Sequence, residues 1–390
     1  MEKKIVSCYR CAQKLRVPAT GALEVKCPKC AFSWRTDIDE QANANEDVFK
    51  QKLEDIVFDE LPKDGALKIA VIGKVSTGKS SLINALFQRD KSDPIASVGA
   101  LSGVTTTVSY YKLEDDVFVC DSPGLNDIKS ENSDVTKEFL KDIDLGIFVV
   151  EGSSDASQKQ SFDELKAAVK NHVVVINKFD IYDRLNETGR QNVLNQWKNA
   201  LGVETIYPTV TIGYDPDDTG AIELRGIEEL RDAIFQMLKK TKKDLLLARQ
   251  LKDKSKYATG IITAAVAAVA VEAFVPGSAL YITTTQGVAI ASLNFLYQGK
   301  QLDKSSILAL LPTFAAQNIG TNAFLWIKSF LPPTGVVDAA AAAVASTITF
   351  GMLSAVKYVL ERGYDLSEKQ MLVEQFTRFK KDYSARKLVA

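Results

Sequence analysis

Ionisable side chains are scarce in parts of this 390-residue sequence, and these gaps exclude several kinds of function. The chain has one histidine, His172, which begins an apolar stretch without an acidic or serine neighbour, so we expect it to be structural rather than catalytic. The formal net charge of −1 excludes a global field that draws the molecule to nucleic acid or to a membrane. No apolar run precedes the first cysteines in MEKKIVSCYRC, residues 1–11, so we expect no signal peptide.

Charged residues are also rare in the C-terminal third. The uncharged runs 273–299 and 305–327 hold 27 and 23 residues. A transmembrane helix needs about 20 apolar residues, so length alone permits two to four crossings. Alanine and glycine dominate over leucine there, which favours close helix packing as much as lipid contact. Between residues 258 and 356 the charged residues are Glu272, Lys300, Asp303, Lys304, Lys328 and Asp338.

Two interpretations of this third stay open: a helical bundle that inserts into or lies on a membrane, and an all-α domain of buried alanine-rich helices. The preceding residues 239–256 carry eight Lys and Arg against two Asp. Bases before an apolar segment suit the cytoplasmic surface of a membrane, although a solvated connector helix is the alternative. We therefore expect residues 239–390 to form a basic connector helix and a hydrophobic helical domain. We also expect a cytoplasmic protein that associates with the cytoplasmic face of a membrane.

Four of the five cysteines form two pairs with metal-ligand spacing. Cys8 and Cys11, followed by Cys27 and Cys30, give C-x2-C-x15-C-x2-C, which predicts one structural Zn²⁺ site in a zinc ribbon spanning residues 1–36. Free thiols or a redox pair are the alternative. This cysteine usage indicates a reducing, cytosolic compartment. The first 35 residues hold eight bases against two acids, an excess that suits RNA, DNA, acidic protein or anionic lipid.

The sequence between these two regions alternates between strand and helix patterns. Residues 37–64 are acidic and end in helical apolar spacing, which predicts a linker that becomes a helix. Residues 65–238 contain strands followed by helices, which indicates an α/β fold with a doubly wound, mostly parallel sheet. The strands are expected at 67–72, 107–113, 117–121, 145–150, 173–177 and 206–211, and the helices at 79–88, 134–142, 159–170, 187–201 and 226–240.

A glycine-containing loop follows the first of these strands. The run Gly73-x4-Gly78-Lys79-Ser80 stands between a strand and a helix, the context that a Walker A phosphate-binding loop requires. Backbone N–H groups of such a loop surround the phosphates, Lys79 would reach the β- and γ-phosphates, and Ser80 would bind Mg²⁺. The predicted phosphate-binding residues are Gly73, Lys74, Val75, Ser76, Thr77, Gly78, Lys79, Ser80 and Ser81.

Two later motifs supply groups that a nucleotide switch needs. In GVTTT, residues 103–107, Thr105 is the expected hydroxyl ligand of Mg²⁺, and Thr106 is the alternative. In DSPG, which ends a strand, Asp121 would hold Mg²⁺ through water, and the Gly124 N–H would contact the γ-phosphate. Both motifs therefore predict contacts that depend on the γ-phosphate and its metal ion.

A third motif, NKFD at residues 177–180, selects the base. It ends another strand at the sheet edge where open α/β sheets bind ligands. The Asp180 carboxylate can accept hydrogen bonds from guanine N1–H and N2–H₂, a donor pair that adenine does not offer. Lys178 would lie along the base, and Asn177 would tie this loop to the phosphate loop. In this order on strand ends, the motifs predict GTP or GDP as the ligand.

These motifs resemble those of the translation-factor-related GTPases, particularly their Era-like and dynamin-like branches, over residues 66–238. The resemblance implies a P-loop GTPase fold and assigns the fifth nucleotide-binding element, usually a Ser-Ala pair, to Thr211-Ile212. Small signalling GTPases carry a glutamine after DxxG to orient the attacking water, but Leu125 stands here.

That difference implies slow turnover, helped by a monovalent cation, a dimer partner or an external activator. Ser76 matches a loop serine that helps to place K⁺ in dynamin-like proteins, whereas a small residue that merely fits the loop is the alternative. The predicted catalytic set is Lys79, Thr105, Gly124 and Ser76.

The C-terminal third resembles, in architecture and composition, that of a bacterial GTPase family with a hydrophobic helical domain, and of the immunity-related GTPases. The resemblance implies a GTP-hydrolysing switch that couples nucleotide state to a membrane-associating helical domain. The expected partners are membrane lipid, a second copy through the GTPase domain and an unidentified protein. Nucleic acid is not expected, because the C-terminal third has no basic RNA-binding module. An RNA- or ribosome-associated assembly GTPase and a soluble GTP-regulated scaffold are the alternatives.

Overall fold

The chain folds into two compact units, Pro62–Lys254 and a second one formed by Met1–Leu61 with Ser255–Ala390. The computed structural model describes residues 3–7, 13–18, 24–26, 28–29, 33–35, 65–98, 108–114, 116–122, 143–154, 156–217, 219–275, 278–315 and 336–389.

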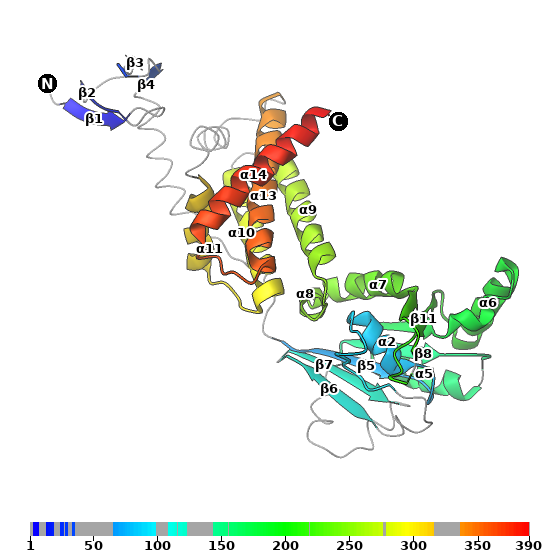
Figure 1. Cartoon of the computed structure of the whole chain (residues 1–390). Helices are drawn as coiled ribbons and strands as arrows, with labels where there is room; N and C mark the ends of the chain where they lie inside the picture. The colour runs from blue at the N-terminus through cyan, green and yellow to red at the C-terminus, as the bar shows by residue number, and fades with distance from the viewer. Residues whose placement is uncertain are drawn as a thin grey trace. The chain divides into compact units, whose positions relative to one another are not determined.

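A six-stranded sheet organises the unit Pro62–Lys254 (Figure 1). Its strand order is β10-β9-β8-β5-β7-β6, and all neighbouring pairs are parallel except β6 with β7. The central strands are almost entirely buried, as expected for parallel strands covered on both faces. The strands are β5 Leu67–Ile72, β6 Ser109–Leu113, β7 Val117–Ser122, β8 Leu145–Val150, β9 His172–Ile176 and β10 Tyr207–Pro208.

The helices between these strands confirm the predicted α/β alternation. Phe148, Phe162 and Trp197 belong to the buried core, and the Trp197 Nε1–H donates to the Gly152 carbonyl at 2.9 Å. The predicted helix at 134–142 lies outside the described residues. The helices are α2 Lys79–Leu86, α5 Ala156–Ala168, α6 Glu187–Leu201, α7 Ile227–Lys239 and α8 Asp244–Arg249, with a 3-10 turn at Phe179–Tyr182.

The strand predicted at 206–211 divides in two. Residues Tyr207–Pro208 join the main sheet, whereas β11, Val210–Ile212, pairs with β12, Glu223–Arg225, in a separate antiparallel sheet. No strand was predicted at β12, because its three residues are too few to show a strand periodicity.

The basic residues 239–254 fold with this unit rather than with the helical domain to which the sequence analysis assigned them. The Lys243 ammonium binds the Asp144 carboxylate at 2.7 Å and the Ala66 carbonyl at 2.8 Å. Arg249 pairs with Asp116 at 3.0 Å and also with Glu114. These bases therefore neutralise acids of the sheet end instead of standing free beside an apolar segment.

Two short antiparallel strand pairs occupy the N-terminal region. β1, Lys3–Ser7, pairs with β2, Lys14–Pro18, and β3, Glu24–Lys26, pairs with β4, Ser33–Arg35. The predicted ligands Cys8, Cys11, Cys27 and Cys30 lie outside the described residues, as does the helix predicted within 37–64. Among the described residues, no group of three or more His, Cys, Asp and Glu is placed to hold a metal ion.

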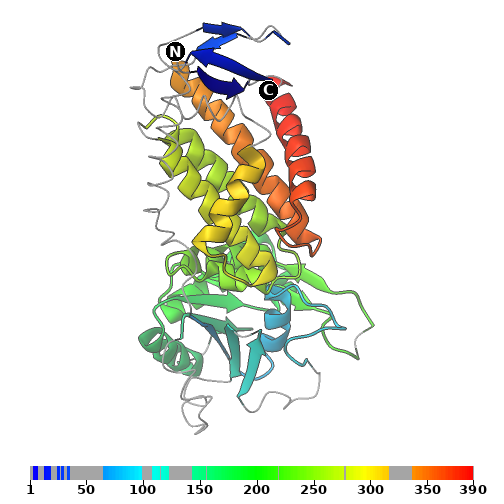
Figure 2. The same ribbon diagram turned by 90° about the vertical axis from the view of Figure 1, so that its left-hand side faces the viewer.

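The described residues from Ser255 on are mostly helical, as predicted. Figures 1 and 2 show α14 along α13, and α13 also packs against α9 and α10. Ala273, Ala341 and Ala345 are fully buried, so small side chains bring these helices close together. The helices are α9 Ser255–Glu272, α10 Ser278–Gln298, α11 Lys304–Ala315, α13 Val336–Glu361 and α14 Lys369–Val389.

One helical stretch of the described residues, Ala339–Glu361, is long and apolar enough to cross a membrane. Its most apolar window has a mean hydropathy of 1.7, and 61% of that window is buried among its neighbours. A buried core helix has the same properties, so this stretch is weak support for a membrane span.

Glu272 brings a carboxylate into the apolar end of α9. One oxygen accepts a hydrogen bond from Thr285 Oγ1 at 2.6 Å, and the buried Oε2 has no hydrogen-bond partner among the described residues. Burial raises the pKa of Glu272 above the ordinary 4.5. Protonation therefore stabilises the fold: this stability is fully present below pH 4.5 and is lost as the pH rises through the folded-state pKa.

We therefore expect Glu272→Gln to raise the melting temperature near neutral pH by about 2 °C, because the variant removes a partly desolvated charge. The gain should shrink as the pH falls toward 4.5, where glutamate itself becomes neutral. Circular-dichroism melts across this pH range measure both effects. The exposed Glu374→Gln on α14 is the control, and an equal shift in both variants would contradict the role of Glu272.

Candidate functional site

The loop between β5 and α2 has the backbone shape of a phosphate cradle. Ser76 and Gly78 adopt positive φ angles of 70° and 83°. A Cβ atom on Gly73 would meet the Val149 carbonyl oxygen at 2.2 Å, and one on Gly78 would meet Asn177 Nδ2 at 2.3 Å. The loop therefore needs glycine at both positions. The buried Thr77 hydroxyl donates to the Lys74 carbonyl at 2.9 Å and closes the turn.

Lys79, Ser80 and Asp121 meet at the start of α2. The Lys79 ammonium lies 3.1 Å from the Lys74 carbonyl and 3.7 Å from Asp121 Oδ1, while the Ser80 hydroxyl donates to Asp121 Oδ2 at 2.9 Å. Burial lowers the pKa of Lys79 and raises the pKa of Asp121, and each group partly offsets the shift of the other.

This constellation fits a phosphate with a hard cation. The buried Asp121 Oδ1 accepts no hydrogen bond from the described residues, so it has capacity for a metal-bound water. A hydroxyl and a carboxylate are oxygen ligands of the kind that Mg²⁺ prefers. Ser81, the next residue of α2, is also buried.

Asn177, at the end of β9, joins the phosphate loop to the base side. Its Nδ2 donates to the Thr77 carbonyl at 3.1 Å, and its Oδ1 accepts from Thr209 Oγ1 at 3.1 Å and Thr211 Oγ1 at 3.2 Å. Thr211, predicted for the fifth nucleotide-binding element, thus contacts Asn177, and its neighbour Ile212 is 39% exposed. The role of this pair in binding the base stays a prediction. The predicted contact between Asn177 and the phosphate loop is present in the structure.

Lys178 and Asp180 extend from the same loop. Lys178 has a positive φ of 56°, and its ammonium pairs with Glu151 Oε2 at 2.6 Å. The buried Oδ1 of Asp180 has no hydrogen-bond partner among the described residues. A buried carboxylate oxygen without a donor is costly, and the two N–H groups of a guanine edge would supply donors.

Buried Arg231 of α7 anchors the far end of the phosphate-loop helix. Its Nε donates to the Leu86 carbonyl and its Nη2 to the Ala85 carbonyl, both at 3.0 Å. Both carbonyls belong to the last turn of α2, and the Ala85 carbonyl also accepts from the Gln88 N–H at 3.1 Å. The guanidinium thus caps the C-terminal end of the helix.

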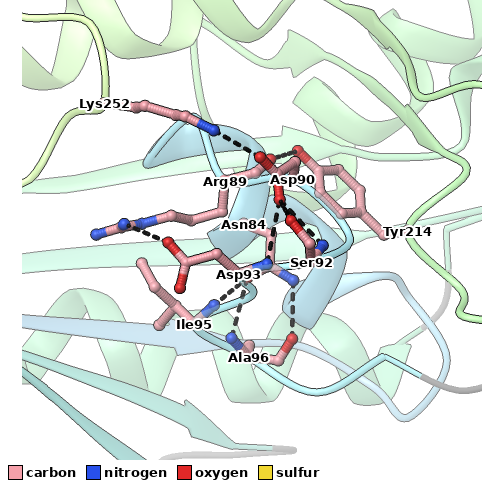
Figure 3. A network of polar contacts seen from close by, with 9 residues as sticks. All are labelled: Asn84, Arg89, Asp90, Ser92, Asp93, Ile95, Ala96, Tyr214 and Lys252. Atoms are coloured by element: carbon pink, nitrogen blue, oxygen red, sulfur yellow. Dashed lines mark hydrogen bonds and ion pairs between the residues drawn. The ribbon is translucent and has the colours of Figure 1, made fainter.

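Figure 3 shows a polar network in the segment after α2. Asn84 accepts from the Ile95 and Ala96 N–H groups at 2.8 and 3.0 Å and donates to the Ala96 carbonyl at 2.8 Å. The Tyr214 hydroxyl donates to the Arg89 carbonyl at 2.9 Å. Residues 88–96 are therefore fastened to both the phosphate-loop helix and the loop that follows β11.

The same segment contacts the end of the unit. Lys252 Nζ donates to Asp90 at 2.5 Å, and the Asp253 N–H donates to Gln88 Oε1 at 2.7 Å. The hydrogen bond from Lys252 holds the pKa of Asp90 well below its usual range. Through these contacts the segment after α2 is joined to the last residues before Ser255.

Some predicted functional residues lie outside the described part of the chain, and some residues near the site were not predicted from the sequence. Thr105, Thr106, Gly124 and Leu125 lie outside the described residues, so their roles stay predictions. Sequence reasoning missed Glu151, Thr209 and Arg225. Glu151 directly follows a buried strand, which is a position that could have marked it as a site residue.

Residues 68–178 match the sequence model of the family described as 50S ribosome-binding GTPase. The matched segment contains the phosphate loop, Asp121 and the start of NKFD, which are the groups that the fold brings together. This segment is a P-loop GTPase domain of the Era, MnmE and Der type. The predicted GTPase fold is thereby confirmed, whereas the zinc ribbon and the likeness to immunity-related GTPases stay predictions.

Curated relatives of the GTPase domain share about a quarter to a third of its residues. The tRNA modification GTPase MnmE of Koribacter versatilis (strain Ellin345) is 28% identical over 50% of this chain and 39% of its own length. GTPase Era of Caldanaerobacter subterraneus subsp. tengcongensis is 29% identical over 29% of this chain and 40% of its own. GTPase Der of a Nitratiruptor species is 32% identical over 36% of this chain and 30% of its own. The chain thus spans less than half the length of these relatives.

Proposed function

We propose that this protein binds GTP with Mg²⁺ and hydrolyses it slowly to GDP and phosphate. The main support for this proposal is the buried cluster of Lys79, Ser80 and Asp121, in which both other side chains lie close to the Asp121 carboxylate. Lys79 would neutralise charge on the β- and γ-phosphates, and the loop N–H groups would bind their oxygens. Ser80 and Asp121 would hold Mg²⁺, which supplies further charge neutralisation when bound.

The nucleotide state would reach the helical unit through residues 88–96. This segment leads from α2 into the predicted Thr105 region, and its fastening to Lys252 and Asp253 supports the proposal. A change in the loops around the γ-phosphate would alter the hydrogen bonds of Asn84 and Asp90. It would thereby change the conformation of the residues that precede α9 at Ser255. Coupling of this kind needs different contacts in the GTP and GDP states.

A hydrolysis assay on the full chain with Mg²⁺ tests the activity, and running it in K⁺ and in Na⁺ tests the cation proposed near Ser76. Hydrogen exchange with GDP and with a slowly hydrolysed GTP analogue tests the coupling. We expect amides in 88–98 and 249–254 to exchange at different rates in the two states. Protection limited to residues 73–81 would leave the GTPase intact but contradict the coupling.

Membrane lipid is the partner that we propose for the helical unit. Four large apolar side chains at the end of α9 and the start of α10 support it, namely Val271, Phe274, Val275 and Tyr281, with exposed fractions between 41% and 71%. Flotation of the full chain with vesicles of anionic lipid tests the proposal. Failure to float in either nucleotide state would contradict it.

Association with RNA is a second candidate function. The matched family is described as ribosome-binding, and one set of relatives acts on tRNA by name. In this chain, exposed bases on the N-terminal strand pairs and the turn between β3 and β4 favour it, namely Lys14, Arg16, Lys26 and Lys29. Binding to phosphates should weaken steeply with salt. Retention of ribosomal RNA at low salt, and its loss when these four residues become alanine, would support this candidate over lipid.

Zinc binding by the N-terminal region also remains a proposal. Each C-x2-C motif lies in sequence between two paired strands, β1 with β2 and β3 with β4, as in a knuckle that closes a hairpin. Four thiolates would form a closed structural site. Metal analysis should find about one Zn²⁺ per chain, and Cys8→Ser with Cys27→Ser should release it. Full-length protein without zinc would contradict the proposal.

A further inference from the structure

A salt bridge between Arg225 and Asp183 lies beside the loop that contains NKFD, and neither residue belongs to a nucleotide-binding motif. Both terminal nitrogens of Arg225 donate to the Asp183 carboxylate, at 2.9 Å to Oδ1 and 2.6 Å to Oδ2. Asp183 lies three residues after Asp180, and its N–H donates to the Asp180 carbonyl at 3.0 Å. This bidentate contact therefore holds the turn that contains Asp180, the predicted acceptor for guanine.

The strand that carries Arg225 is fixed to the other side of the same loop. β12 pairs with β11, where Leu224 lies opposite Thr211, and the Thr211 hydroxyl binds Asn177. The residues 177–183 are therefore held at Asn177 by β11 and at Asp183 by β12. Phe179 N–H adds a bond to the Thr209 carbonyl at 3.0 Å.

The loop between β11 and β12 is itself anchored. The Tyr214 hydroxyl donates to the Arg89 carbonyl at 2.9 Å, as Figure 3 shows, and Lys91 Nζ donates to the Gly220 carbonyl at 2.8 Å. Gly213 and Gly226 take positive φ angles of 87° and 70°, and a Cβ atom on either would strike backbone within 2.5 Å. The hairpin is consequently a fixed support from which Arg225 can hold Asp183.

We propose that Arg225 is a positioning residue for guanine recognition, which clamps the 177–183 loop so that Asp180 faces the base. The inference rests on the proposed GTP binding and deepens it. Arg225 lies outside the nucleotide-binding motifs, and its clamp would lower the rate at which the guanine nucleotide dissociates. The side-chain contacts of Arg225 within the described part of the chain are with Asp183 and Glu223, so it should act on the base side.

Charge and geometry both favour a guanidinium at this position. The hydrogen bond to Asp183 raises the pKa of Arg225, and the nearby charges of Asp183, Glu223 and Asp180 act in the same direction. A lysine would keep the charge but not the planar fork that meets both carboxylate oxygens. The two side chains are 45% and 46% exposed, so the clamp contributes modestly.

The test measures dissociation of a fluorescent GDP from the full chain with Mg²⁺. We expect Arg225→Ala to speed dissociation about three- to fivefold, and Arg225→Lys to have a smaller effect. Glu223→Ala is the matched control on the same strand, because it removes the 3.2 Å contact to Arg225 Nε but leaves both bonds to Asp183. The exchange of partners, Asp183→Arg with Arg225→Asp, should restore slow release.

A second readout separates positioning from loss of folding. Arg225→Ala should raise KM for GTP and lower the preference for guanine over hypoxanthine nucleotides, which lack the 2-amino group, while kcat stays unchanged. Equal dissociation rates in Arg225→Ala, Glu223→Ala and the unaltered chain would overturn the clamp but leave GTP binding intact. No saturable guanine-nucleotide binding by the unaltered chain would overturn both proposals.

Discussion

Replacing Lys79 with alanine is expected to weaken binding of GTP about a hundredfold or more. The ammonium is 3% exposed and sits between the Lys74 carbonyl and Asp121, so it meets an incoming phosphate from a largely dehydrated position. Removing one partner of such a buried charge contact costs about 2 to 5 kcal/mol. Each 1.4 kcal/mol is a factor of about ten in the dissociation constant. Calorimetric titration with GTP and Mg²⁺ measures the loss.

The same substitution also disturbs the fold, and the experiment must separate the two effects. Without Lys79 the fully buried Asp121 carboxylate loses its nearby cation, and a buried charge without a partner is destabilising. Lys79→Met keeps the apolar stem and limits the cavity, so it serves as the second variant. Lys159→Ala, an exposed lysine on α5, controls for loss of one positive charge. Retained micromolar affinity in a folded Lys79→Met protein would refute the phosphate-loop assignment.

The parts of the fold that were predictable have signals within a short stretch of sequence. IAVI in β5 and LGIFVV in β8 are continuous apolar runs, because parallel strands in the middle of a covered sheet bury both faces. The phosphate loop is an equally local signal, because Gly73-x4-Gly78-Lys79-Ser80 lies within one short run of sequence. The contacts that require its glycines come from Val149 and Asn177, which the sequence alone does not place beside the loop. The site residues on strand ends followed from these elements, because parallel strands present their carboxyl ends at one edge.

The parts that were not predictable depend on partners distant in sequence. Lys243 and Arg249 suggest a membrane surface when only their apolar neighbours are considered. Their carboxylates, Asp144 and Asp116, lie 99 and 133 residues away, and no local pattern reveals that pairing. The role of Arg225 could not be predicted for the same reason. The strand ELR is too short to show a periodicity, and Asp183 lies 42 residues earlier.

The helical unit shows a different limit of sequence reasoning. Alanine-rich runs satisfy both lipid and close helix packing, because the two environments are similarly apolar. In the structure, Ala341 and Ala345 are buried against α9 and α10, so packing alone accounts for their composition. Packing does not explain the exposed Val271, Phe274, Val275 and Tyr281, and vesicle binding would test these residues.

Changing Asp180 to asparagine is expected to redirect base selectivity from guanine to xanthine. The buried Oδ1 of Asp180 lacks a donor among the described residues, and guanine N1–H and N2–H₂ together supply two. Asparagine offers one acceptor and one donor group, which matches the N1–H and the 2-carbonyl of xanthine. Affinity for GDP should fall about 10- to 100-fold, because hydrogen bonds to a charged group contribute about 1.5 to 3 kcal/mol. Affinity for xanthosine diphosphate should rise by a similar factor.

Competition between the two diphosphates for one site makes this result independent of protein concentration and of partial unfolding. A folding defect lowers both affinities, whereas a change in base reading moves them in opposite directions. Asp163→Asn on α5 is the control, since its carboxylate is 54% exposed and forms an ion pair with the surface residue Lys159. If Asp180→Asn keeps the guanine preference, the base must be read elsewhere. The Lys178–Glu151 pair, at 2.6 Å, is then the next contact to alter at this site.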